Sequence, residues 1–172
     1  MAVYEKASKR VSDKTTLIKF VAGILAFVLV FIGTVFVIQQ ATKGLDYSDF
    51  SDNVITKVSE VTEQDEEKYL VYIYSSNSNS EAIKEDVLNF AEENEAGIKV
   101  YFVDYANFSG DDKKVEKDEL AALLDKAADK LDNLMPVLLA VKDGKIVGRH
   151  VTNDDIVGTL KDVNKGGYVK FN

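Results

Sequence analysis

Cysteine and tryptophan are absent from this chain of 172 residues, and proline and histidine occur once each. The absence of cysteine excludes disulfide bonds, thiolate metal sites, thiol nucleophiles and a cysteine-linked lipid anchor. A single histidine excludes a metal site built from several imidazoles. The sequence therefore predicts no catalytic residue, no metal site and no cofactor.

Positive charge is also scarce, since the net charge is −8. Phosphate binding needs a basic surface, so this balance argues against a nucleic-acid partner. The charges are divided unevenly along the chain. Residues 1–19 hold five basic and two acidic residues, a net charge of +3, whereas residues 44–172 hold 15 basic and 27 acidic residues, a net charge of −12.

The boundary between these parts is a run of nineteen residues without a charge, from Phe20 to Ile38. As a helix it would be about 28 Å long, close to the thickness of the hydrocarbon core of a bilayer. We expect a transmembrane helix over residues 20–40 that contacts lipid through residues 20–38. A cleaved secretory signal is the alternative, but its apolar core is usually shorter, about 7–15 residues, and Gln39-Gln40-Ala41 matches a cleavage motif poorly.

The basic residues on the amino-terminal side of this run indicate its orientation, because cytoplasmic flanks are rich in Lys and Arg. We therefore expect a single-pass protein of the cell membrane. Its basic tail, residues 1–19, would be cytoplasmic, and everything beyond about residue 42 would be extracytoplasmic.

The spacing of apolar residues predicts an α/β domain beyond the anchor. Residues 41–66 are expected to form a linker and a first amphipathic helix over 46–61, and residues 67–172 the main domain. Predicted strands cover 69–74 and 98–105, with a helix between them, and a second helix covers roughly 116–131. A hairpin over 136–151 turns at Lys142-Asp143-Gly144-Lys145, where Asp-Gly favours positive φ at both central residues. A last helix, about 154–162, would be capped by Asn153 or Asp154. The order is α-βαβ-α-ββα with a mixed sheet.

That order, together with several local motifs, resembles the thioredoxin family over about residues 45–162. Leu134-Met135-Pro136-Val137 is similar to the family's cis-proline segment, which lies before the hairpin, and Val71-Tyr72-Ile73-Tyr74-Ser75 is similar to the strand that enters its active-site turn. The resemblance implies a thioredoxin-like mixed sheet flanked by helices.

The chain departs from the family where the redox motif would be. Ser78-Asn79-Ser80-Glu81 takes the place of Cys-x-x-Cys, and serine cannot perform disulfide exchange. The same residues fit a capping box, in which Ser78 and Glu81 would satisfy each other's backbone amides. The turn is therefore either a helix cap alone or a cap that also lines a binding surface.

The resemblance implies a candidate groove between this turn and the cis-proline loop. Its residues would be Ser76, Asn77, Ser78, Asn79, Ser80, Glu81, Met135 and Pro136. We expect a protein or peptide partner to bind there through backbone contacts, with Met135 as an adaptable apolar contact. Two further hypotheses are a diverged thiol-disulfide oxidoreductase and a structural accessory subunit of a membrane complex.

The remaining polar residues have simpler interpretations. We expect His150 to be a surface residue at the end of a strand, and Asp46, Asp49 and Asp52 to form a solvated helix face. Asp111-Asp112 is interpreted as part of an acidic solvated loop. The tail over 166–172 alternates apolar and polar residues after two glycines, and it would add an edge strand or dock on a partner.

Overall fold

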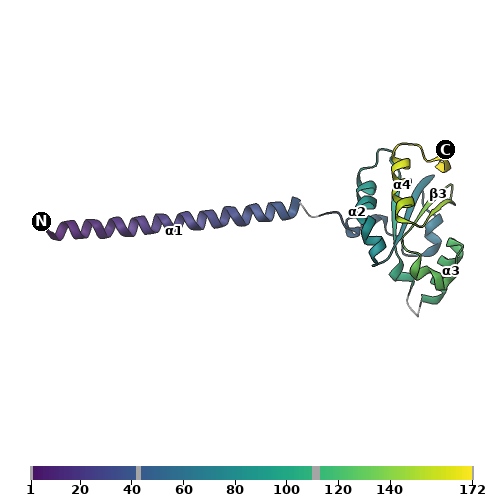
Figure 1. The fold of residues 1–172 in the computed structure, drawn as a ribbon, viewed down its shortest axis with the longest axis horizontal. Helices are drawn as coiled ribbons and strands as arrows, with labels where there is room; N and C mark the ends of the chain where they lie inside the picture. Colours follow the sequence, from purple (N-terminus) through teal and green to yellow (C-terminus); the bar gives the residue numbers. More distant parts are fainter. Residues whose placement is uncertain (1, 42–43, 110–112, 172) are drawn as a thin grey trace. The chain divides into compact units, whose positions relative to one another are not determined.

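The computed structural model describes the backbone of residues 2–41, 44–109 and 113–171 (Figure 1). Side chains before residue 16 and those of residues 36–41 are outside this description, as is the Asp111-Asp112 pair. The chain divides into two units, Met1–Gly44 and Leu45–Asn172.

The first unit is one helix, α1, over Ala2–Ala41. Its segment Thr16–Val35 has a mean hydropathy of 2.5, and its side chains are exposed. A helix of 20 residues is about 30 Å long, which matches the hydrocarbon core of a bilayer. The described part of the chain thus contains one helix that is apolar and long enough to span a membrane.

A mixed sheet of four strands forms the centre of the second unit. The strands are β1 (Lys68–Tyr74), β2 (Lys99–Asp104), β3 (Val137–Lys142) and β4 (Lys145–His150), and their order is β2-β1-β3-β4. β1 runs parallel to β2 and antiparallel to β3, and β4 is antiparallel to β3. Asp143 and Gly144 at the hairpin turn have φ of 50° and 69°, which confirms the predicted positive φ at both positions.

The helices cover both faces of this sheet. Figure 1 shows α2 (Ser78–Glu93) beside α4 (Asn153–Asn164), and α3 (Lys114–Leu124) on the opposite face. Alternate residues of β1 serve the two cores, since Leu70 and Tyr72 pack toward α2 and α4, whereas Val71 and Ile73 pack toward α3. The predicted α/β architecture is confirmed.

The predicted helix over 46–61 is wrong. The segment forms two short 3₁₀ helices, Tyr47–Asn53 and Val58–Thr62, with an extended stretch between them. There Val54 pairs in parallel with Phe102 of β2, and the Ile55 amide donates to the Phe102 carbonyl at 2.9 Å. Unpaired backbone groups at the edge of β2 favour this pairing over a helix. Phe50 packs in the core on the side of α2 and α4, whereas Val58 and Val61 pack on the side of α3. Val54 itself is exposed.

Two other boundaries differ from the predictions. α3 ends at Leu124, because Asp125 takes a left-handed conformation with φ of 55°, and a 3₁₀ helix over Ala128–Asn133 then buries Leu131. The cap of α4 is Thr152, whose hydroxyl accepts from the Asp155 amide, rather than Asn153 or Asp154.

The tail docks on its own domain. It forms a 3₁₀ helix over Val169–Phe171, and Tyr168 and Phe171 are buried in the core on the side of α2 and α4. It is therefore not the edge strand that the alternating pattern allowed.

Candidate functional site

Three segments meet where β1 ends: the turn over 75–81, the loop before β3 and the start of α4. Asn77 Nδ2 donates to the Met135 carbonyl at 3.0 Å, and Asn153 Nδ2 donates to the Asn79 carbonyl at 3.0 Å. The Met135-Pro136 peptide bond is cis, as the resemblance implied. The structure thus brings the predicted turn and proline loop into direct contact.

The cap of α2 differs from the predicted capping box. Asn77 is the N-cap, and its Oδ1 accepts from the Ser80 amide at 2.8 Å. Ser78 is already the first helical residue. Asparagine is as good an N-cap as serine, and its amide group also supplies the donor to Met135. Ser80 is 1% exposed, and its Oγ accepts from the Ser75 amide at 3.2 Å.

The predicted groove residues divide into exposed and buried sets. Ser76, Ser78, Asn79 and Glu81 are exposed, and Asn77 is half-buried. Met135 is 1% exposed and packs in the core on the side of α3, and Pro136 is also buried. The Met135 side chain is therefore a core residue and not the surface contact expected of it. We call the exposed set together with the half-buried Asn153 the turn surface.

A cluster of tyrosines lies behind the turn. The rings of Tyr47 and Tyr74 stack with centroids 3.8 Å apart, and Tyr72 stacks on both at longer range. Lys84 Nζ lies 5.0 Å from the centre of the Tyr47 ring and 2.8 Å from the Asp46 carboxylate. These contacts attach the segment that follows the linker to α2.

The hydroxyls of this cluster are protonated at neutral pH. Burial raises the pKa of Tyr47 and of Tyr72 far above the usual value, and it raises the pKa of Tyr74 to about 12. The Tyr72 hydroxyl lies near those of Tyr47 and Ser80. Neither tyrosine hydroxyl, however, reaches hydrogen-bond geometry with any described residue. The cluster supplies no general base.

Asp46 and Asp49 have a structural role that the sequence interpretation missed. Asp46 accepts from the Tyr47 amide, and the Asp49 carboxylate accepts from the Asp46 amide at 2.8 Å. Together they cap the first 3₁₀ helix, in addition to the ion pair between Asp46 and Lys84. Both residues are exposed, as the predicted solvated face required, but the helix expected to carry them is replaced by the 3₁₀ helix that they cap.

The prediction that His150 is a surface residue is also wrong, because it is 8% exposed. Its Nε2 lies 2.9 Å from the Tyr168 hydroxyl, and its Nδ1 lies 2.9 Å from the Asp155 carboxylate and 3.1 Å from the Thr159 hydroxyl. The network fastens the tail to β4 and α4. Burial and Asp155 raise the pKa of Tyr168 to about 12, so this hydroxyl is a neutral hydrogen-bonding group.

One signal could have placed His150 correctly. Gly148 and His150 are two residues apart on β4, so they share a face, and both are buried on the side of α4.

Within the described residues, no group of three His, Cys, Asp or Glu side chains is arranged to hold a metal ion.

Two observations decide the fold of the second unit. The order β2-β1-β3-β4 has a parallel first pair and an antiparallel hairpin, and a cis-proline precedes the hairpin at the end of the sheet where α2 begins. The domain has a thioredoxin-like fold. The chain has no cysteine and therefore no Cys-x-x-Cys motif.

Solved structures similar to the chain include thioredoxins from two fungi. The Malassezia sympodialis thioredoxin Mala s 13 is 16% identical over 67% of this chain and 90% of that chain, with a TM-score of 0.47. Oxidised mitochondrial thioredoxin 3 of Saccharomyces cerevisiae is 14% identical over 66% and 91%, with a TM-score of 0.44. A chain from a structural study of thiol resolution in the yeast mitochondrial 1-Cys peroxiredoxin is 14% identical over 64% and 93%, with a TM-score of 0.46. No family model and no curated protein matches the chain.

The two hydrogen bonds of Asn77 can be separated by substitution. Asn77→Ser keeps an N-cap acceptor but removes the donor to Met135, so it should lower the free energy of unfolding by about 1 kcal/mol. Asn77→Ala removes both the N-cap acceptor and the donor to Met135, so it should lower the free energy of unfolding by about 2 kcal/mol. Urea unfolding of the full chain in micelles, followed by the near-ultraviolet circular dichroism of tyrosine, measures both values. If the serine variant matches the wild type, the bond to Met135 contributes nothing to stability.

Proposed function

We propose that this protein is a membrane-tethered, extracytoplasmic thioredoxin-like module without redox chemistry, which binds a protein or peptide partner at the turn surface. One observation carries the proposal: the turn of a thioredoxin-like fold is retained beside its cis-proline, but it presents exposed small polar residues in place of cysteines. Function depends on the site and not on the fold, and this site offers hydrogen bonds.

The geometry of the turn suits recognition of a main chain. Ser76 and Ser78 have short side chains, so a partner's backbone can approach closely. The turn is held from two sides, by Asn77 on Met135 and by Asn153 on Asn79. A surface that is ordered before binding loses less entropy when the partner arrives. Because Met135 is buried and its carbonyl already accepts a bond, contacts would fall on the turn surface itself.

The proposed tether is supported by the apolar helix Thr16–Val35 and by the contrast between a basic tail and an acidic domain. Because the chain has no native cysteine, a thiol-reactive label on this protein reports only the cysteine that is introduced. In intact cells stripped of any outer barrier, a membrane-impermeant maleimide should label Ser59→Cys, which is exposed in the domain. It should label Ser8→Cys in the basic tail only after lysis. Labelling in the reverse order would contradict the proposed sidedness.

The same approach tests partner binding. A benzophenone maleimide attached at Asn79→Cys should give a discrete cross-linked product in membranes. The matched control is Asp118→Cys, which is exposed on α3, on the opposite face of the sheet, and it should give none. Identical products from both positions, or none from Asn79, would count against the turn surface. Exchange of residues 20–38 for an unrelated apolar segment should leave capture unchanged, whereas loss of capture would favour a subunit that assembles through its anchor.

A further inference from the structure

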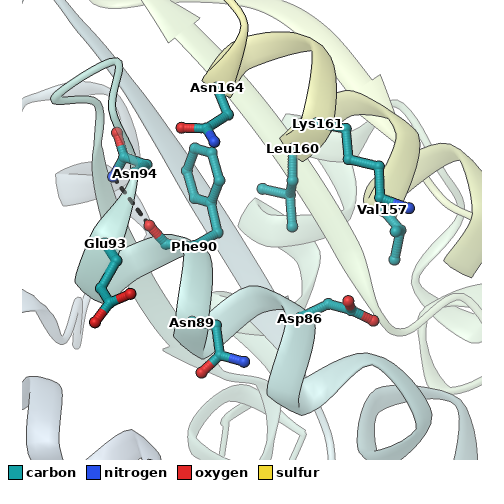
Figure 2. A pocket seen from close by; sticks show the side chains of 9 residues that line it. All are labelled: Asp86, Asn89, Phe90, Glu93, Asn94, Val157, Leu160, Lys161 and Asn164. Carbon is teal, nitrogen blue, oxygen red and sulfur yellow. Dashed lines mark hydrogen bonds between the residues drawn. The ribbon is translucent and has the colours of Figure 1, made fainter.

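A second surface follows the seam between α2 and α4, toward the end of α2 that is far from the turn. A cavity of about 260 Å³ opens there between the two helices. Figure 2 shows the side chains of Phe90 from α2 and Leu160 from α4 directed into this space, with Val157 beside them. The floor of the cavity is therefore apolar.

The rim of this cavity is polar, with three asparagines, two acidic residues and one lysine. Asp86 and Glu93 stand on its α2 side, and Lys161 is its one cation. Asp86 and Glu93 are exposed, and neither forms an ion pair or a side-chain hydrogen bond within the described residues. α2 as a whole carries five acidic residues and one lysine, Lys84, which is already paired with Asp46 at 2.8 Å. α2 thus carries an excess of negative charge.

A second cavity, of about 240 Å³, continues the seam beyond the ends of both helices. Ile98, Val163, Tyr168 and Phe171 supply most of its lining, and Lys68, Ala96 and Gly166 complete it. A hydrogen bond lies between the two cavities: the Glu95 amide donates to Asn164 Oδ1 at 2.7 Å. Asn164 lines the first cavity, and its neighbour Val163 lines the second. The seam therefore offers two successive apolar openings below an acidic helix.

The size of the cavities restricts what can fill them. Both fall below the roughly 300 Å³ at which small-molecule sites begin, so each suits one or two side chains of a protein. A helix that presents apolar side chains along one face can place them in successive openings of a groove. Cationic residues around that face would complement the acidic residues of α2.

We propose that the α2–α4 seam docks a cationic amphipathic helix of a partner protein, with apolar side chains of that helix in the two cavities. This surface does not include the turn surface, so the two proposals can fail separately. The acids of α2 select the charge of the partner, and the openings on either side of the Glu95–Asn164 bridge select the spacing of its apolar residues.

The test uses the full chain in nanodiscs of phosphatidylcholine and a labelled 18-residue peptide of leucine and lysine, with the leucines on one helical face. Fluorescence anisotropy measures the dissociation constant, and empty nanodiscs define the background. Asp86→Lys with Glu93→Lys should weaken binding about tenfold, since two attractions become repulsions. The control pair, Asp118→Lys with Glu119→Lys on α3, makes the same change in net charge and should weaken binding much less.

A second variant tests the apolar floor. Val157→Arg places a bulky cation in the first cavity and should weaken binding about tenfold, whereas Val115→Arg on the exposed side of α3 should not. Equal losses from both charge pairs, no binding above empty nanodiscs, or equal binding of a glutamate version of the peptide would each overturn the proposal. It would also be overturned by sedimentation of the wild type as a dimer that Val157→Arg dissociates, because the occupant would then be a second copy.

Discussion

Replacement of Gly148 by alanine is expected to lower the free energy of unfolding of the domain by about 2–3 kcal/mol. A Cβ atom at this position on β4 would overlap the Tyr168 hydroxyl oxygen and would lie 3.1 Å from His150 Nε2. Tyr168 cannot move aside cheaply, because it is buried and bonded to His150. Overpacking of this kind typically costs 1–3 kcal/mol. Urea unfolding of the full chain in micelles measures the loss.

Two further variants show whether this contact is the cause. Tyr168→Phe removes the overlapping oxygen. It should therefore lower the free energy of unfolding less in the Gly148→Ala background than in the wild type. Gly158→Ala in α4 is the matched control, since the added Cβ would meet no atom within 4 Å apart from its chain neighbours and the backbone of its own helix. It should leave stability unchanged or raise it by about 0.5–1 kcal/mol. Equal losses from the two glycine substitutions would refute the role assigned to Tyr168.

Met135→Asp is expected to remove most of the stability of the domain, about 4 kcal/mol or more. The Met135 side chain is 1% exposed within the core on the side of α3, and a carboxylate there would have no partner. Met135→Leu keeps the volume and should cost less than about 1.5 kcal/mol. Thermal unfolding in micelles, followed by near-ultraviolet circular dichroism, separates the two outcomes.

The same charge at an exposed position of the site provides the control. Ser78→Asp lies in the first turn of α2, where a carboxylate is favourable to the helix dipole, and it should change stability by no more than about 0.5 kcal/mol. If Met135→Asp unfolds like the wild type and only partner capture is lost, then Met135 acts at the surface and its placement in the core is wrong.

The sequence was most informative where a structure depends on neighbouring residues. Asp143-Gly144 sets its turn through its own φ values, and the strands are runs of apolar residues that need cover on both faces. It was least informative where a distant segment decides the outcome. Val54 leaves the helical pattern because Phe102, far along the chain, offers a backbone to pair with.

The candidate site divides in the same way. A cap at the start of α2 was predictable, since Asn77 and Ser78 are both good capping residues. Asn77 is the cap because its side-chain amide also donates a hydrogen bond to the Met135 carbonyl. His150 was misplaced because its partners Asp155, Thr159 and Tyr168 come together only after α4 and the tail have packed.

The stretch over 54–55 that pairs with β2 bears on the proposed attachment to a membrane. Molecules confined to a bilayer meet often, and an edge strand with unpaired backbone groups can form hydrogen bonds with the edge strand of another copy. Here the chain shields one border of its sheet with residues that lie just after its linker. The other border, β4, carries Lys145 and Arg149, and like charges discourage joining there. Both borders of the sheet therefore oppose edge-to-edge association of copies of this domain.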